Sequence, residues 1–243
     1  MIDLFGLPFT AAAPFLKHTI LAAQGTDPSL LSRTLAYLDR RSELVWGLFL
    51  EHLWLVLLSV AIAIVVSIII GILISYYTGA AGLVLSVCQI LMTIPSIAML
   101  GFLVPLFGIG FRTGMIALIL YSLLPIVRNT YTGIKELSPA IVESAVAMGM
   151  TEWRILSKVK IPLAMPVIMA GIRTATVMVV GIGAIAAYVG AGGLGSLIFQ
   201  GISRQSEPMI IAGALGVSVI ALVFDFVLSG GERYFAARGK AGR

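Results

Sequence analysis

The sequence predicts an all-α membrane protein that crosses the bilayer about five times. Of its 243 residues, 59% are hydrophobic and 11% are charged, and its mean hydropathy is +1.07. Soluble domains carry about 25% charged residues. The charges lie between long uncharged runs, and a membrane helix needs roughly 20 apolar residues. Several such runs use most of the chain, so we expect one transmembrane domain and no soluble catalytic domain.

The formal net charge of +5 is interpreted as an orientation signal rather than a nucleic-acid surface. The basic residues cluster beside apolar runs, and no basic patch alternates with aromatic side chains as nucleic-acid binding would need. We therefore expect a lipid bilayer around the chain and no nucleic-acid partner. The single cysteine of the sequence, Cys88, lies in an apolar run and can form no internal disulfide.

Residues 1–52 are expected to form an N-terminal segment with an amphipathic helix at the membrane surface. Residues 1–24 are moderately apolar, but Asp3 stands where a signal peptide is basic, and two prolines, a lysine and a histidine interrupt the run. They predict neither a cleaved signal nor a membrane span. Residues 25–52 mix charged and apolar side chains, which favours a helix lying in the interface.

Five apolar runs are assigned as membrane spans, and they cover residues 53–74, 80–111, 114–127, 162–189 and 209–228. At about 1.5 Å per residue, the second run is too long for one straight crossing and too short for two. We predict one span with a kink at Pro95, because proline removes a backbone donor. Arg112 and Thr113 are expected in a short loop, and residues 190–208 in a loop after the fourth span.

The basic residues predict the orientation of the chain. Five of the 16 lysines and arginines lie between Arg128 and Lys160, and residues 231–243 form a basic tail. Two spans separate these regions, so they lie on one side. The positive-inside tendency places both, and with them the C terminus, in the cytoplasm. The N terminus then lies outside.

Several motifs that would indicate chemistry are absent from the sequence or stand in the wrong context. Residues 190–195 match the G-x-G-x-x-G dinucleotide fingerprint, but they follow an apolar helix rather than a strand, so we interpret them as a flexible external turn. No Walker G-x-x-x-x-G-K-[ST] motif occurs. His18 and His52 stand alone and are expected to be surface or interfacial residues rather than metal ligands.

Arg173 is the one charged residue in the fourth apolar run. Two interpretations are open. Its stem extends toward the lipid headgroups, which we favour, or its guanidinium lines a polar path through the membrane.

The segment 136–162 is a polar interruption between apolar runs, and its residue types suit a short helix followed by a turn. Pro139 follows a serine, which favours a helix that begins at the proline. Glu143 then lies in the early turns, where the helix dipole favours a carboxylate. Gly149 permits a sharp change of direction, and Pro162 is expected to start the next helix.

Three side chains near this turn offer adaptable apolar contacts for a partner, namely Met148, Met150 and Trp153. An ordinary solvated loop is the alternative interpretation of the composition.

The spacing of this segment resembles the coupling motif of permease subunits of binding-protein-dependent ABC importers. That motif reads Glu-Ala-Ala, three residues, Gly, nine residues and Ile-x-Leu-Pro. Glu143, Ala145, Gly149 and Pro162 match it in register, while Ser144, Val159 and Ile161 replace three of its members. Other stretches resemble the osmoprotectant branch, which imports glycine betaine, carnitine or choline; these are Pro95–Ala98, Ile109–Gly110, Leu124–Ile134 and Gly192–Gly195. The likeness covers roughly residues 50–230.

This resemblance implies a fold like that of type I ABC importer permeases, with a transmembrane domain at residues 53–230 in the inner membrane. It implies a cytoplasmic ABC ATPase, an extracellular or periplasmic solute-binding protein and a second permease copy or paralogue. ATP is then bound by the ATPase, so this chain is expected to hold no cofactor or metal and to be no enzyme. The residues expected to couple it to the ATPase are Glu143, Ser144, Ala145, Gly149, Met150, Trp153 and Pro162. Those expected in a pathway or hinge are Pro95, Arg173, Gly192 and Gly193.

Two other functions stay open at this stage. Methionine importers have permeases of similar size and motif. An ion-coupled secondary carrier or channel is a different class, disfavoured because such proteins bury ionisable groups near the midplane and the spans here hold almost none. A membrane enzyme is disfavoured further by the missing acid, base and metal constellations.

Overall fold

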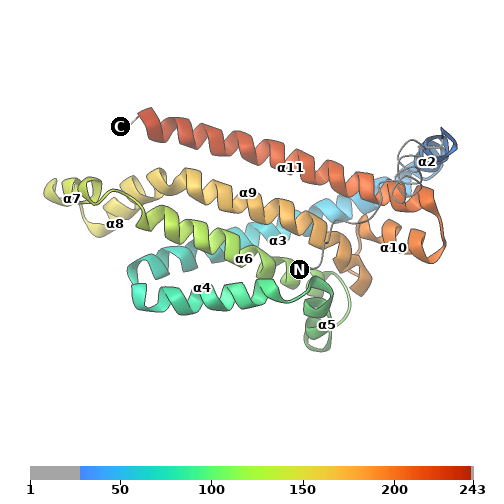
Figure 1. Ribbon diagram of the computed structural model, residues 1–243, viewed down its shortest axis with the longest axis horizontal. Coiled ribbons are helices and arrows are strands. Elements are labelled where there is room, and N and C mark those ends of the chain that lie inside the picture. The colour runs from blue at the N-terminus through green and yellow to red at the C-terminus, as the bar shows by residue number, and fades with distance from the viewer. Residues whose placement is uncertain (1–27, 242–243) are drawn as a thin grey trace, which may run out of the picture.

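Four long helices and the first half of a broken helix run side by side in this computed structural model (Figure 1), which describes residues 28–241. The long helices are α3 (Ser42–Tyr76), α6 (Phe111–Lys135), α9 (Ile161–Ala186) and α11 (Glu207–Ala241). The broken one consists of α4 (Thr78–Thr93) and α5 (Ser96–Phe107). All regular elements of the described residues are helical, which confirms the predicted all-α class (Figure 1).

The number of spans agrees with the prediction. Within the described residues, four helices are long and apolar enough to cross a membrane, at Ser42–Tyr76, Phe111–Lys135, Glu152–Val189 and Glu207–Ala237. The pair α4 and α5 passes the same test together, and counting the pair as one span gives five. The expectation that residues 1–24 neither span the membrane nor form a signal lies outside the described residues.

The predicted kink at Pro95 is present but much sharper than a kink, because α5 is bent by 101° from α4. Ile94 is extended, with ψ 128, as expected for a residue before proline. The hydroxyl of Tyr121 on α6 donates a hydrogen bond to the carbonyl of Ile94. The bond satisfies a carbonyl that the break removes from its helix, so α5 turns across the bundle instead of continuing it.

Two predicted loops are wrong. Arg112 and Thr113 lie in the first turn of α6, where the Thr113 hydroxyl bonds the carbonyl of Gly108. Residues 190–208 contain α10 (Gly195–Ser203) after the short η2 (Ala187–Val189). Leu194 and Leu197 are buried in the core, and this burial orders a segment whose glycines alone favour a loop.

The N-terminal part of the described chain packs against the last helix. Helix α2 (Pro28–Arg40) contacts α11, and Arg33 lies 3.6 Å from Glu207 across that contact. The next helix, α3, begins at Ser42. Residues 42–52, expected in an interfacial helix, are therefore the first turns of the first spanning helix.

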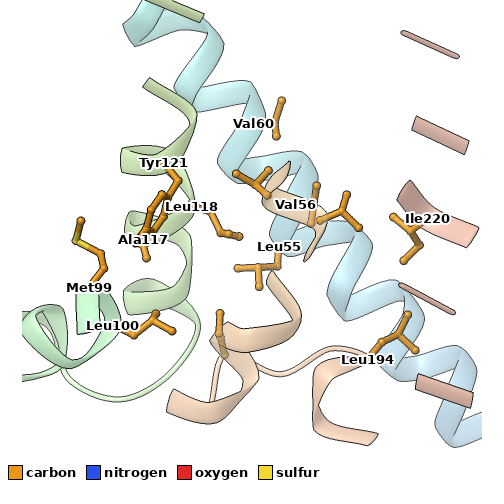
Figure 2. Packing of buried hydrophobic residues seen from close by; sticks show 14 of the residues in the cluster. Leu55, Val56, Val60, Met99, Leu100, Ala117, Leu118, Tyr121, Leu194 and Ile220 are labelled. Carbon is orange, nitrogen blue, oxygen red and sulfur yellow. The ribbon is translucent and has the colours of Figure 1, made fainter. Parts of the chain in front are cut away.

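The largest apolar core lies where α3, α5, α6, α9, α10 and α11 meet (Figure 2). Leu55 and Val56 of α3 face Leu118 of α6, while Leu100 of α5 and Leu194 before α10 close the ends of the cluster (Figure 2). All five side chains are at most 1% exposed. The broken helix is thus anchored through α5, and the residues after the fourth span are anchored through Leu194.

Helix α6 is the centre of the bundle and contacts α3, α4, α5 and α9. Its contact with α9 depends on Gly171. A Cβ atom at Gly171 would lie 2.7 Å from the Pro125 carbonyl oxygen and 2.7 Å from Cβ of Asn129. Small residues allow such close backbone approach between membrane helices.

We predict that Gly171→Ala destabilises the protein by about 1–3 kcal/mol, the usual range for overpacking. The new methyl group must push α6 and α9 apart. Gly181→Ala is the matched control on the same helix, because a Cβ there meets nothing within 4 Å and alanine is the better helix former. Thermal unfolding of the purified protein in detergent measures both. Equal melting temperatures for the two variants would contradict the tight α6–α9 contact.

Candidate functional site

The segment predicted to meet a partner forms a helix, a turn and a second helix outside the bundle. Helix α7 (Pro139–Ala147) begins at Pro139 after Ser138, as predicted, although the Ser138 side chain makes no capping hydrogen bond. The second helix is α8 (Glu152–Ile155). Proline is well suited to the first helical position because its missing N–H needs no partner there.

Gly149 makes the turn between these helices. Its φ is +75°, a left-handed conformation in which a Cβ atom is strained. The Gly149 N–H bonds the Val146 carbonyl at 2.9 Å and the Met150 N–H bonds the Ala145 carbonyl at 3.2 Å. This is the Schellman pattern that closes a helix C-terminus. The predicted role of Gly149 as the turn residue therefore has a defined geometry.

The α7–α8 segment presents an exposed apolar surface. Met148 and Trp153 are each 73% exposed and Val146 is 59% exposed. Glu143 and Ser144 are also exposed, and the Ser144 hydroxyl bonds the carbonyl of Ala140. By contrast, Ala145 is only 2% exposed and forms the inner side of α7. Large apolar side chains at such exposure are typical of a protein-contact surface.

Helix α8 runs without a loop into the membrane. It passes through η1 (Leu156–Lys160), a π-helical turn, into α9, and together they form one helix of 38 residues from Glu152 to Val189. Pro162 lies in the first turn of α9, near the helix start that the sequence predicted, but α9 continues directly from η1 rather than beginning after a loop. Pro162 has no N–H to donate within the helix. The N–H of Ile161 bonds the carbonyl of Leu156, five residues back, and this is the hydrogen-bond pattern of the wider π turn.

A groove beside α8 connects the segment to the end of α3. Its volume is about 410 Å³, and it is lined by Ile72, Leu73, Tyr76, Tyr77, Glu152, Trp153 and Leu156. Lys160 lies over the ring of Tyr76, with Nζ 4.6 Å from the ring centre. The cation–π contact and the buried Leu156 hold the start of the long helix against α3.

The segment and the C-terminal end of α11 lie at the same end of the bundle, while α2 and α10 lie at the other end (Figure 1). This agrees with the sequence argument that an even number of spans separates the two basic regions.

Gly192 and Gly193 come just before α10, which lies at the opposite end of the bundle from α7 (Figure 1). Both have positive φ, +82° and +77°. The Gly193 N–H donates to Oε2 of Glu51 at 3.1 Å, and a Cβ on Gly193 would lie 2.9 Å from Nδ1 of His52. The turn is therefore packed against α3, so the expectation that residues 190–195 are flexible is wrong.

His52 is buried, with 0% exposure, so the predicted surface or interfacial position is wrong. Its Nε2 donates to the Val180 carbonyl at 3.1 Å, and its Nδ1 has no hydrogen-bond partner. The ring fills the space that Gly183 and Gly193 leave. The burial of His52 could not be predicted from the sequence, because the glycines that make room for its ring are more than 120 residues away along the chain. His18 lies outside the described residues.

Arg173 forms an ion cluster that the sequence analysis missed. Its guanidinium bonds both carboxylate oxygens of Asp225, at 2.7 and 2.9 Å, and one of Glu232 at 3.3 Å. Asp225 and Glu232 are seven residues apart on α11, so they share one helix face. The seven-residue spacing of the two carboxylates was the sequence signal that could have indicated a shared partner. Only the tertiary fold shows that α9, with Arg173, packs against that face of α11.

The site residues expected from the sequence thus fall into separate places. Glu143, Ser144, Ala145, Gly149, Met150 and Trp153 lie together at the α7–α8 end, with Pro162 just inside the bundle. Pro95 lies at the α4–α5 break, Arg173 on the α9–α11 contact, and the two glycines against α3. No group of three or more His, Cys, Asp or Glu side chains that could hold a metal occurs in residues 28–241.

Residues 63–239 match the family described as "Binding-protein-dependent transport system inner membrane component". The chain belongs to this family. It is thus a multi-pass inner-membrane transport component of an ABC importer that works with a solute-binding protein, and ATP hydrolysis resides in a separate subunit. This confirms the resemblance seen in the spacing of residues 143–162.

Two curated relatives of this importer component cover most of its length. The osmoprotectant import permease protein OsmW of Salmonella typhimurium is 46% identical over 200 residues, covering 80% of this chain and 93% of the relative. The glycine betaine/carnitine/choline transport system permease protein OpuCB of Bacillus subtilis is 42% identical over 192 residues, covering 79% and 88%.

Solved structures of ABC transporters share the fold of the chain. An inward-facing structure of the MetNI methionine ABC transporter superposes with a TM-score of 0.67 at 21% identity and covers 79% of this chain and 94% of that one. A crystal structure of an amino acid ABC transporter with histidines superposes with a TM-score of 0.67 at 23% identity. It covers 82% of this chain and 97% of that one. These likenesses confirm the predicted permease fold.

We predict that Glu51→Leu loosens the Gly192–Gly193 turn, because the Gly193 N–H loses its acceptor. A hydrogen bond contributes about 0.5–1.5 kcal/mol, so amide exchange in residues 190–195 should speed up roughly two- to tenfold. Hydrogen–deuterium exchange with mass spectrometry measures this. Glu51→Gln keeps an acceptor oxygen and should exchange like the unaltered protein. Unchanged exchange in Glu51→Leu would show that the bond does not hold the turn.

Proposed function

We propose that this chain is the permease subunit of an importer for a small osmoprotectant such as glycine betaine, carnitine or choline. The observation that carries the proposal is the similarity to relatives named for these solutes, at 46% and 42% identity over 80% and 79% of the chain. A choline transport system permease protein of Bacillus subtilis adds 40% identity over 78% of the chain. The alternative from the sequence, a methionine permease, is supported by fold likeness alone.

The α7–α8 segment is the proposed docking surface for the cytoplasmic ABC ATPase, which binds the ATP. Its exposed Met148 and Trp153 offer apolar contact area, and the Gly149 turn lies between them in the chain. The C-terminal end of α11 lies at the same end of the bundle (Figure 1), so the C terminus is cytoplasmic in this assignment. The opposite end, with α2 and α10, then faces the solute-binding protein, and a second permease copy or paralogue completes the transporter.

The continuous helix from Glu152 to Val189 gives this surface a route into the membrane. A movement of the ATPase that displaces Trp153 acts on α8, and no loop separates α8 from α9. The π turn at Leu156–Lys160 is the place where this helix bends most easily, because its hydrogen bonds differ from those of the surrounding α-helix. Rigid helices that shift about such points are a common means of alternating access.

We predict that Gly149→Val reduces both uptake and co-purification with the ATPase subunit. A β-branched residue at φ +75° costs at least about 1–2 kcal/mol, so the turn changes shape and the docking surface is lost. Gly79→Val is the control in a helix at the same end, where a Cβ meets nothing within 4 Å and φ is not positive.

Glu143→Lys tests the same surface by reversing the charge of one side chain that is exposed on α7. It should weaken ATPase association while the thermal stability of the isolated permease stays the same. Normal uptake and normal co-purification in both Gly149→Val and Glu143→Lys would rule out the docking role.

The substrate is tested by uptake in cells that produce the complete transporter and lack other osmoprotectant importers. We expect accumulation of radiolabelled glycine betaine, carnitine or choline, and its loss when the ATPase subunit is inactivated. Accumulation of methionine instead would support the amino-acid alternative. Transport by this chain alone in liposomes would indicate an ion-coupled carrier or channel.

A further inference from the structure

A basic cavity lies where α2 meets the start of α11, at the end of the bundle opposite the α7–α8 segment (Figure 1). Its volume is about 500 Å³. Ser206 and Pro208 form its wall on the α11 side, and they come just before the apolar run 209–228. The cavity therefore lies at the start of α11 and not along its apolar part. The lining residues from α2 and the turn after it are Arg33, Ala36, Tyr37, Arg40 and Arg41.

The positive charge of this cavity is only partly balanced by the chain. Arg33 lies 3.6 Å from a carboxylate oxygen of Glu207, and both side chains are more than half exposed. Arg40 and Arg41 are exposed, and neither forms an ion pair with any other part of residues 28–241. Three arginines and one glutamate leave a formal charge of +2. The cavity thus offers guanidinium donors to an anionic partner.

The arginines of α2 lie on the side opposite its exposed leucines. Arg33 and Arg40 are seven residues apart and share one face of the helix, whereas Leu31 and Leu35 are four residues apart and share the opposite face. The two leucines are 56% and 66% exposed. An amphipathic helix beside a bilayer turns its apolar face to the lipid and its charged face to the water. The arginine face of α2 is therefore directed away from the lipid.

The location of these arginines runs against the usual distribution of charge in membrane proteins. Lysine and arginine are enriched on the cytoplasmic side. In the orientation that places the α7–α8 segment in the cytoplasm, however, the cavity lies outside. A positive surface there attracts and orients a partner with a negative surface as it approaches. The position favours a docking role for the arginines over a role in orienting the chain.

We infer that the arginine cavity between α2 and α11 is the place where an acidic surface of the solute-binding protein docks. The inference rests on the proposed function, which supplies the partner and the orientation, and it adds the side chains that hold the partner. Carboxylates of the binding protein pair with Arg40 and Arg41, because a guanidinium binds a carboxylate through two parallel hydrogen bonds. Arg33 stays paired with Glu207 and keeps α2 on α11.

The phosphate of an anionic lipid is the competing ligand for such donors. A lipid headgroup would approach α2 from the bilayer, where Leu31 and Leu35 face it. The arginines lie on the other side of the helix. An external protein reaches them directly, so the arrangement of α2 favours the protein over the lipid.

Binding of the purified solute-binding protein to the assembled transporter in phosphatidylcholine nanodiscs tests this inference without measuring transport. Arg40→Gln and Arg41→Gln each remove one charge, keep a polar side chain and break no ion pair within residues 28–241. Each should weaken binding roughly two- to fivefold, the effect of one exposed ion pair. The loss should shrink when NaCl rises from about 0.05 to about 0.5 M, because salt screens exposed charges.

Arg112→Gln is the matched control. Arg112 is exposed in the first turn of α6. Because α6 ends just before α7, its first turn lies at the same end of the bundle as the cavity, but Arg112 does not line the cavity. This variant should bind the solute-binding protein like the unaltered transporter.

Unchanged binding in both Arg40→Gln and Arg41→Gln would overturn the inference. An equal loss in Arg112→Gln would overturn it too, since the effect would then come from net charge and not from the cavity. Phosphatidylglycerol that co-purifies with the unaltered transporter but not with Arg40→Gln, while protein binding is unchanged, would show a lipid site instead. Uptake decides the proposed function separately, because transport of methionine in place of osmoprotectants would refute that function and leave the docking result standing.

Discussion

The close approach of α6 to its neighbours is the contact on which the rest of the structure depends. Lipid tails are as apolar as the side chains, so membrane helices gain little from burying apolar area and associate through tight packing. Gly171 lets α9 approach the Pro125 carbonyl of α6, and Gly71 lets α3 approach Thr130, where a Cβ would lie 2.6 Å from that of Thr130. With α3, α6 and α9 fixed in this way, α4, α5 and α11 have defined surfaces to pack on.

This packing also connects the exposed segment to the interior. The long helix that begins at Glu152 becomes α9, α9 packs on α6, and Tyr121 of α6 bonds the carbonyl beside Pro95. The path from the α7–α8 segment to the broken helix therefore consists of helix contacts rather than loops. A displacement of α8 can reach α5 through two tightly packed interfaces, because packed interiors transmit movement rather than absorb it.

The two ends of the bundle differ in how their turns are stabilised. At the α7–α8 end, Gly149 has open space around it, and only the backbone geometry requires glycine. At the other end, Gly193 is confined by His52 and bonded to Glu51. An exposed turn suits a surface that a partner covers, whereas the packed turn holds the start of α10 against α3.

Much of the fold was determined by the sequence itself. The apolar runs required spanning helices, because backbone groups in a bilayer must be bonded within the helix. Pro95 located the break, and the spacing from Glu143 to Pro162 located the exposed segment. These features are local, since they depend on hydropathy, on a missing N–H or on the conformation of one glycine.

Only the tertiary structure decided features that join distant residues. The sequence showed Arg173, Asp225 and Glu232 as separate charges, and their pairing requires α9 and α11 to lie side by side. It showed His52 as a lone polar residue, although Val180 and Gly193 enclose it. Residues 190–208 have the glycines of a loop, yet burial of Leu194 and Leu197 makes part of them a helix. Burial and ion pairing depend on which helices meet, and helix packing in three dimensions sets this.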